Sequence, residues 1–460
     1  MSTGTEGVER GGEGGAPDWT VQYLRDHVIH VAVVVLFAVY PFLYGFLTSQ
    51  FGLPAEMVLP RTRTMLAILW FGLFAISFDF VSGYTGYLSF GHAAFFGIGA
   101  YFVVLGYNGQ IPLLPAEMPF MALMVLGGLA AMVFALLVGL ISFRLSGVYF
   151  AMITLGVAEI LFVVASHWNY LTPGSSHPSD GVAAGTQGTS SFDPEIGVPF
   201  VDALQAQVGR FGDQSFLVFE FGEPQVLSYF LIGSVVLVSY FAMQRIIHSP
   251  FGRVMIAIRE NEERAKAIGY NTFWYKIGAF MISAFFGAIA GALMISFEGV
   301  AQPNTTLFFL VTGFALVAAI IGGLGTLAGP LFGYVFLEGV QEFLAREGGG
   351  GGLQPFLQET LPGGVLDLSI AGMSINEALD SFMTGHGEFY AGIIFVIFVL
   401  YVPIGMLGTL RARLGTQSVA KHVSRKLAGG QPSADETDVE EPEAGGEALG
   451  ADDAEEGDDD

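Results

Sequence analysis

The chain has 460 residues, of which 52% are hydrophobic and 13% are charged, whereas an ordinary soluble domain carries about 25% charged residues. This composition, with 42 Phe and 63 Gly, excludes a soluble enzyme and indicates an all-α fold, a polytopic transmembrane helical bundle. Cysteine is absent, which excludes a disulfide framework, a thiol nucleophile and a cysteine-ligated metal site.

The net charge of −24 is concentrated at the C-terminal end, where residues 428–460 hold fourteen Asp and Glu and no Lys or Arg. We expect this acidic tail to be disordered, because it has few apolar side chains to bury. Lysine is scarce, with four Lys against fourteen Arg, and the outer loops are also acidic. Together these features favour a halophilic source; the alternative is an acidic tail without environmental meaning.

In chain order, a polar N-terminal segment (1–27) precedes a predicted transmembrane domain (28–410). About 20 apolar residues cross a bilayer, and ten stretches fit, although glycines interrupt the third, Leu88–Tyr107, which also contains His92. That span is either continuous or broken. The ten predicted spans are Val28–Leu47, Thr64–Ser82, Leu88–Tyr107, Pro119–Phe143, Val148–Ser166, Val226–Ile247, Lys276–Phe297, Thr306–Leu324, Ala328–Leu344 and Glu388–Leu410.

The distribution of basic residues predicts the orientation. If both termini are cytoplasmic, fourteen Lys and Arg lie inside, including those of a basic juxtamembrane segment (411–427), and four lie outside. Arg61 and Arg63 are exceptions on the outer side. The outer loops 167–225 and 346–387 are long and acidic, so each is either a docking face for an extracellular partner or acidic filler.

The predicted cytoplasmic loop 245–275 carries a helical pattern. Ser249 is a suitable cap and Pro250 suits the first turn, apolar residues recur at helical spacing, and Gly269 is typical of a helix end. The pattern predicts a short amphipathic helix. Such a helix either fits the groove of a partner or anchors the loop at the membrane surface.

Four sequence blocks resemble the permeases of binding-protein-dependent ABC importers, and most closely the LivM-type subunit for branched-chain amino acids. They run in family order over about three fifths of the chain. The blocks are Gly83–Tyr101, Phe143–Leu155 with Glu159, Ser249–Arg253 with Ala257–Glu262, Ala265 and Gly269, and Ile321–Pro330.

The resemblance implies a plasma-membrane permease for Leu, Ile and Val that works by alternating access. The implied partners are a homologous second permease subunit, two cytoplasmic ATP-binding subunits, an extracellular solute-binding protein and membrane lipid. The chain lacks a Gly-x-x-x-x-Gly-Lys-Ser/Thr loop, so an ATPase must be a separate chain. We expect no catalytic activity, cofactor or metal here, and acidic exposed regions disfavour nucleic acid.

Two alternatives remain. Asp79 stands where many amino-acid members carry Asn, and an acid there resembles the related urea permeases, so urea or short amides are an alternative solute. A stand-alone secondary transporter is the weaker alternative, since it needs a coupling-ion site of its own. A membrane enzyme is disfavoured, because the chain has neither His-Glu-x-x-His nor Gly-x-Ser-x-Gly.

The candidate site residues fall into two groups. The resemblance assigns contact with the ATPase to Arg253, Arg259, Glu260, Asn261, Glu262, Ala265 and Gly269. Ionisable residues within spans are expensive and indicate function, and with their neighbours they form a candidate translocation pathway: Asp79, Gly83, Gly86, Ser89, Gly91, His92 and Glu159.

Each pathway candidate also has a structural interpretation. Asp79 can reach water from a span end, His92 can be a hydrogen-bonded packing residue, and the glycines can permit close helix packing. Glu159 can pair with His92 or with groups near Asp79 instead of lining the pathway. The glycine pattern of residues 83–91 returns at 322–329, which is either an internal duplication or two glycine-rich helix starts.

Overall fold

The structure is a computed structural model. It describes residues 59–112, 114–115, 118–145, 147–170, 178–184, 224–345, 369–370, 373–374, 387–402 and 405–409, with most of 35–47. The chain divides into two units after Leu410, and every described residue belongs to the first. The predicted segments 1–27, 411–427 and 428–460, and most of the loops 167–225 and 346–387, therefore lie outside the described residues.

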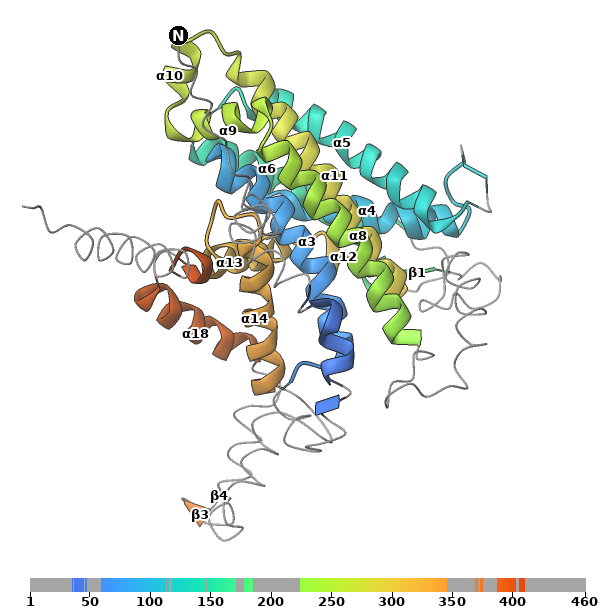
Figure 1. The fold of residues 1–460 in the computed structure, drawn as a ribbon. Helices are drawn as coiled ribbons and strands as arrows, with labels where there is room; N and C mark the ends of the chain where they lie inside the picture. Colours follow the sequence, from blue (N-terminus) through green and yellow to red (C-terminus); the bar gives the residue numbers. More distant parts are fainter. Residues whose placement is uncertain are drawn as a thin grey trace, which may run out of the picture. The chain divides into compact units, whose positions relative to one another are not determined.

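The described chain is mainly helical (Figure 1). Its helices are α3 (Thr62–Thr85), α4 (His92–Tyr107), α5 (Phe120–Ser142), α6 (Val148–His167), α8 (Pro224–Ile247), α9 (Pro250–Glu260), α10 (Glu262–Ala267), α11 (Thr272–Glu298), α12 (Pro303–Thr306), α13 (Phe309–Gly322), α14 (Gly329–Ala345) and α18 (Gly387–Tyr401), with a 3₁₀ turn η1 (Pro178–Asp180).

Seven helical stretches among the described residues are long and apolar enough to cross a membrane. They are α3, α5, α6, most of α8, α11, the pair α12–α13, and Gly392–Thr409, which begins within α18. The third predicted span appears as the 16-residue α4 and the ninth as the 17-residue α14. Of the first predicted span, Val28–Leu47, residues 28–34, 36 and 45 lie outside the described residues, so the count of ten stays a prediction.

Helices α3 and α11 form the centre of the bundle, where α11 packs on α3, α4 and α5 (Figure 1). Glycines allow this packing: a Cβ at Gly99 would collide with the backbone of Ala288, and one at Gly291 with the backbone of Phe96. The backbones of α4 and α11 therefore meet directly, as small residues permit inside membranes. The break before α4 follows from Gly86, whose φ of +78° ends α3 in a left-handed conformation.

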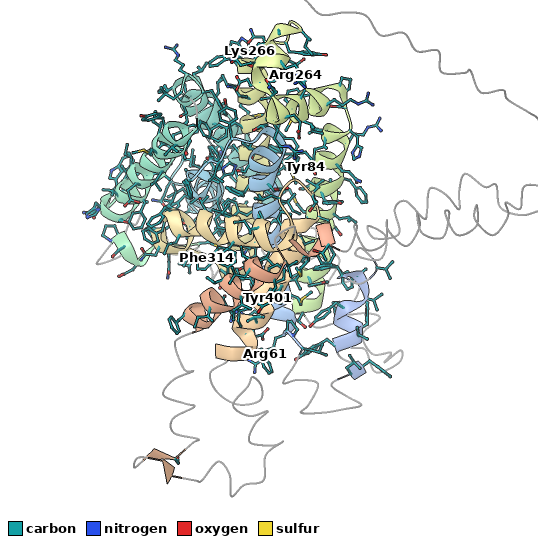
Figure 2. The ribbon with its side chains drawn as sticks, turned by 90° about the vertical axis from the view of Figure 1, so that its left-hand side faces the viewer. Arg61, Tyr84, Arg264, Lys266, Phe314 and Tyr401 are labelled. Carbon is teal, nitrogen blue, oxygen red and sulfur yellow. The ribbon has the colours of Figure 1, made fainter. Side chains whose placement is uncertain are left out.

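Segments that were predicted on the same side of the membrane meet in the structure. At one end, Arg63 pairs with Glu298 at 3.1 Å, and the antiparallel strands β1 (Val182–Ala183) and β2 (Val300–Ala301) pair. Figure 2 places Arg61 at this end and Arg264 and Lys266 at the opposite one. The ion pair with Glu298 accounts for Arg63, a basic residue on the side of the membrane where the charge distribution predicts few.

A second antiparallel pair consists of β3 (Ser369–Ile370) and β4 (Met373–Ser374). The end of the bundle that holds α9, α10 and the turn between α3 and α4 is called the inner end below. It corresponds to the predicted cytoplasmic side.

Candidate coupling and translocation site

The predicted amphipathic helix is two helices, α9 and α10. Ser249 caps α9, with Pro250 in its first turn, and the Ser249 hydroxyl donates to the carbonyl of Ile246 at 2.6 Å. Asn261 has extended backbone, which ends α9, and its Oδ1 accepts from the backbone N–H of Arg264 at 2.8 Å, which begins α10. An asparagine that competes for backbone hydrogen bonds accounts for the break.

Glu262 ties α10 to the rest of the inner end. Its Oε1 accepts from Lys276 Nζ at 2.8 Å and from the Thr272 hydroxyl at 2.9 Å, and its Oε2 accepts from the Tyr87 hydroxyl at 2.5 Å. Lys276 is only 5% exposed and its Nζ lies 4.5 Å from the centroid of the Tyr87 ring. This cluster, Glu262–Lys276–Tyr87, joins α10, the start of α11 and the turn after α3.

The cluster is matched electrostatically. Burial raises the pKa of Glu262, but hydrogen bonds from Lys276, Tyr87 and Thr272 outweigh burial and lower that pKa from 4.5 to about 2. Burial and the neighbouring Glu262 carboxylate raise the pKa of the Tyr87 hydroxyl above its usual value. Glu262 is therefore ionised and Tyr87 neutral at physiological pH, so Tyr87 acts as a donor.

Arg259 makes a second link from α9. Its Nη1 donates to the carbonyl of Gly83 at 2.8 Å, and a Cβ on Gly86 would lie 3.2 Å from the Arg259 Cγ. Asp79 Oδ1 in turn accepts from the backbone N–H of Gly325 at 2.9 Å. The two glycine segments that share a pattern in the sequence, 83–91 and 322–329, are thus neighbours at the inner end.

The underside of the helix pair is apolar. Val254, Ile258 and Ala265 are buried together against Tyr87 and Tyr275. Ala265 therefore acts through packing, whereas Arg253, Glu260, Asn261 and Gly269 are exposed.

Sequence reasoning missed an exposed apolar patch beside α10. Ile268 is 67% exposed, Trp274 55% and Tyr270 41%. Gly269 adopts φ +95°, which turns the chain after α10. A large aromatic next to a glycine that ends a helix could have signalled this patch.

His92 lies in the core rather than at the inner surface. Its Nε2 lies 2.7 Å from the Ser283 hydroxyl, and that hydroxyl donates to the carbonyl of Ser77. The histidine therefore donates through Nε2–H, since the serine hydrogen is already used. The rings of Phe78, Phe95 and Phe280 pack edge-on around His92.

The remaining pathway candidates have different environments. A Cβ at Gly91 would collide with the backbone of Thr154, so α6 packs closely there. The buried atoms Asp79 Oδ2 and Ser89 Oγ have no hydrogen-bond partner among the described residues. Glu159 is partly exposed on α6 and makes no ion pair or hydrogen bond with the part of the chain that the structure describes.

The geometry thus brings the coupling candidate Arg259 into contact with the pathway candidates Gly83 and Gly86 at the inner end. Asp79 contacts the same segment and Gly325, whereas Glu159 lies apart. No group of three or more His, Asp or Glu that could hold a metal occurs among the described residues. The described residues hold seven helical stretches long and apolar enough to cross a membrane, with an anchored helix pair at one end. These features define a multi-pass membrane protein.

Residues 61–366 match the family model "Branched-chain amino acid transport system / permease component". That match covers more than half of the chain, so the chain belongs to this family of permease subunits.

Named relatives agree with the family. The chain is 26% identical over 306 residues to the high-affinity branched-chain amino acid transport system permease protein LivM of Escherichia coli K12, covering 66% of this chain and 65% of that protein. With LivM of Salmonella typhimurium the identity is 27% and the coverage 62% of each. LivH of Salmonella typhimurium is 35% identical over 98 residues, which is 21% of this chain and 31% of LivH. No solved structure matches the chain significantly.

Proposed function

We propose that the chain is the permease subunit of an ATP-driven ABC importer for branched-chain amino acids in the plasma membrane. The family and the names of the LivM and LivH relatives support the solute class. The observation that carries the mechanism is the double anchoring of α9–α10 to the turn after α3, through Glu262 to Tyr87 and through Arg259 to Gly83.

In this proposal, a separate ATPase docks on the exposed side of the helix pair. The patch Ile268, Tyr270 and Trp274 offers apolar surface beside the charged α10, which suits a groove on a partner. Arg253, Glu260, Asn261 and Gly269 are also exposed. Two ATP-binding subunits would serve this chain and a homologous second permease, while an extracellular solute-binding protein would deliver the amino acid.

ATP binding and hydrolysis then displace α10. The anchors transmit this displacement to residues 83–91, and the hydrogen bond from Gly325 to Asp79 extends it to residues 322–329. The spans alternate between outward-open and inward-open arrangements as these joints shift. Ser89 and Gly91 belong to the first of these segments and His92 follows it directly, so the same movement reaches the core of α4.

The test is uptake of labelled leucine and of labelled urea, side by side at high salt, in cells with the gene, without it, and with the gene restored. The proposal expects loss of leucine uptake only, and recovery on restoration. Loss of urea uptake alone would overturn the amino-acid assignment. The parent cells must be shown to express the chain. If removal of the gene from these cells then leaves uptake of both solutes unchanged, the proposed solute class is overturned as well.

A further inference from the structure

Helix α6 is one of the least buried spans of the described chain. Its most apolar stretch is 28% buried, against 33% for α8, 12% for Gly392–Thr409 and 89% for α3. A narrow stripe of α6 faces the chain's own helices and includes small residues. The buried residues are Phe150, Ala151, Thr154, Ala158 and Ala165.

The opposite face of α6 is apolar, exposed and notched. Tyr149, Met152 and Ile160 are each more than 60% exposed. Gly156 lies among them, and a Cβ there would meet no atom within 4 Å. Because glycine carries no side chain, this position is a shallow notch where another helix can approach closely.

Glu159 stands beside the notch, three residues after Gly156 and twelfth in the 20-residue α6. Its carboxylate is partly exposed near the middle of a spanning helix, and no described residue pairs with it. An ionisable group at that depth is costly in lipid and usually faces the interior of a bundle, a water-filled cavity or a polar partner. Lipid is therefore a poor neighbour for this side of α6.

The open face of α5 provides a contrast. Val133, Leu137 and Ile141 are exposed there, and α5 contains no ionisable residue. That face is suited to lipid, so exposure of apolar residues alone does not mark a partner. The combination of an open notch and an unpaired carboxylate is what distinguishes α6.

We propose that the face of α6 around Gly156 and Glu159 is the docking face for a homologous permease subunit, which supplies a hydrogen-bond donor or cation to Glu159. This inference rests on the proposed function, because it assumes a second permease. Support comes from the relatives: one organism, Escherichia coli K12, has both a LivM and a LivH permease similar to this chain. A helical partner of the same family fits a helical face with a glycine notch.

The first experiment uses the absence of cysteine. The variants Ile160→Cys on α6 and Leu137→Cys on α5 are spin-labelled in the full complex reconstituted in lipid bilayers, and collisions with oxygen and with a water-soluble nickel complex are measured. We expect the α5 label to be open to oxygen and the α6 label to be shielded from both reagents. Equal oxygen access would make α6 lipid-facing, and high nickel access would make it water-lined; either outcome overturns the proposal.

The second experiment identifies the occupant. A photo-crosslinking amino acid at Ile160 is expected to form an adduct whose peptides belong to the homologous permease, while the same group at Leu137 gives none. An adduct with a second copy of this chain or with the solute-binding protein, or with lipid alone, would overturn the choice of partner.

A matched glycine pair tests the notch. Gly156 and Gly392 both lie on apolar spans with nothing within 4 Å of a Cβ. We expect Gly156→Leu to lower the amount of copurified second permease about tenfold, since interhelical contacts of this kind are modest, and Gly392→Leu to leave it unchanged. Equal effects of the two variants would contradict the docking face. None of these readouts uses leucine, so they fail independently of the solute assignment.

Discussion

Helices α3 and α6 are both apolar enough to span a membrane, but α3 is almost entirely buried by the chain's own helices and α6 is mostly exposed. Around α3, α4 and α11, the protein itself fills every close approach that its glycines create, as at Gly99 and Ala288. At the inner end, it also pairs the carboxylate of Glu262. On α6, the equivalent features, Gly156 and Glu159, are left open.

The difference shows that hydropathy alone does not separate core, lipid-facing and partner-facing helices. A glycine that another helix of the chain packs against, or a carboxylate that the chain itself pairs, indicates internal packing. An open glycine next to a carboxylate that no described residue pairs, as on α6, indicates a surface for a partner. The following variants test each side of this comparison with a matched residue from the other side or from the same helix.

The largest effect is expected at the contact between α4 and α11. Gly99→Val places side-chain atoms where the backbone of Ala288 lies, and overpacking of a core costs about 3 kcal/mol or more when backbones must separate. Gly156→Val meets open space and should leave stability nearly unchanged. Size-exclusion profiles and thermal denaturation in detergent compare the two; similar losses would contradict the packing described for α4 and α11.

The next effect is expected at Glu262. Glu262→Ala leaves Lys276 buried without its carboxylate partner, and breaking a buried pair costs about 3 to 5 kcal/mol. Glu263, whose side chain is 85% exposed beside Lys266, is the matched control, and an exposed pair contributes about 0 to 1 kcal/mol. Denaturation midpoints of the two variants give the comparison.

A second-site variant separates charge burial from loss of packing. Adding Lys276→Met to Glu262→Ala removes the stranded ammonium, so we expect most of the lost stability to return. If the double variant is as unstable as Glu262→Ala, the buried charge is not the cause.

A smaller effect is expected at Arg259. Its hydrogen bond to the carbonyl of Gly83 is charge-assisted, and loss of such a bond costs about 1.5 to 3 kcal/mol when buried, with less at a partly exposed site such as this one. Arg253→Ala is the control, because Arg253 is exposed on the same helix and its side chain makes no hydrogen bond or ion pair with a described residue. Urea denaturation of the two variants in detergent should show a loss for Arg259→Ala alone.

The smallest effect is a dependence on acid. The pKa of Glu262 is about 2 in the folded chain and 4.5 in its usual range, so the ionised form stabilises folding above pH 4.5. That contribution is lost as the pH falls from about 4.5 to about 2. The stability difference between the wild type and Glu262→Gln should shrink over that interval, and a constant difference would contradict the pairing.

Much of the fold could be predicted from the sequence, because membrane spans are recognised by the length of their apolar stretches. The fold class, the family and the cap at Ser249 followed from local patterns. The break at Asn261 did not, since a polar residue between two charged turns is also compatible with a continuous helix. The pairing of Glu262 with Lys276 and Tyr87 depends on contacts between segments far apart in the chain, which spacing does not encode.

The two glycine segments were found as a repeated pattern, but their contact was not. It depends on how α3 and α13 pack, and on Asp79 reaching the Gly325 N–H. The exposure of Ile268 was not predicted, because the break at Asn261 interrupts the helical spacing along the loop. The roles assigned to the coupling and pathway residues remain predictions.

The most direct test of the account severs both anchors of α9–α10 and leaves the Glu262–Lys276 pair intact. Tyr87→Phe with Arg259→Ala does so, because it removes the hydroxyl bound to Glu262 and the guanidinium bound to Gly83. Leucine uptake and ATP hydrolysis are measured together in the complete complex in lipid vesicles. The account predicts that hydrolysis persists while uptake per ATP collapses; an unchanged ratio of uptake to hydrolysis would contradict it.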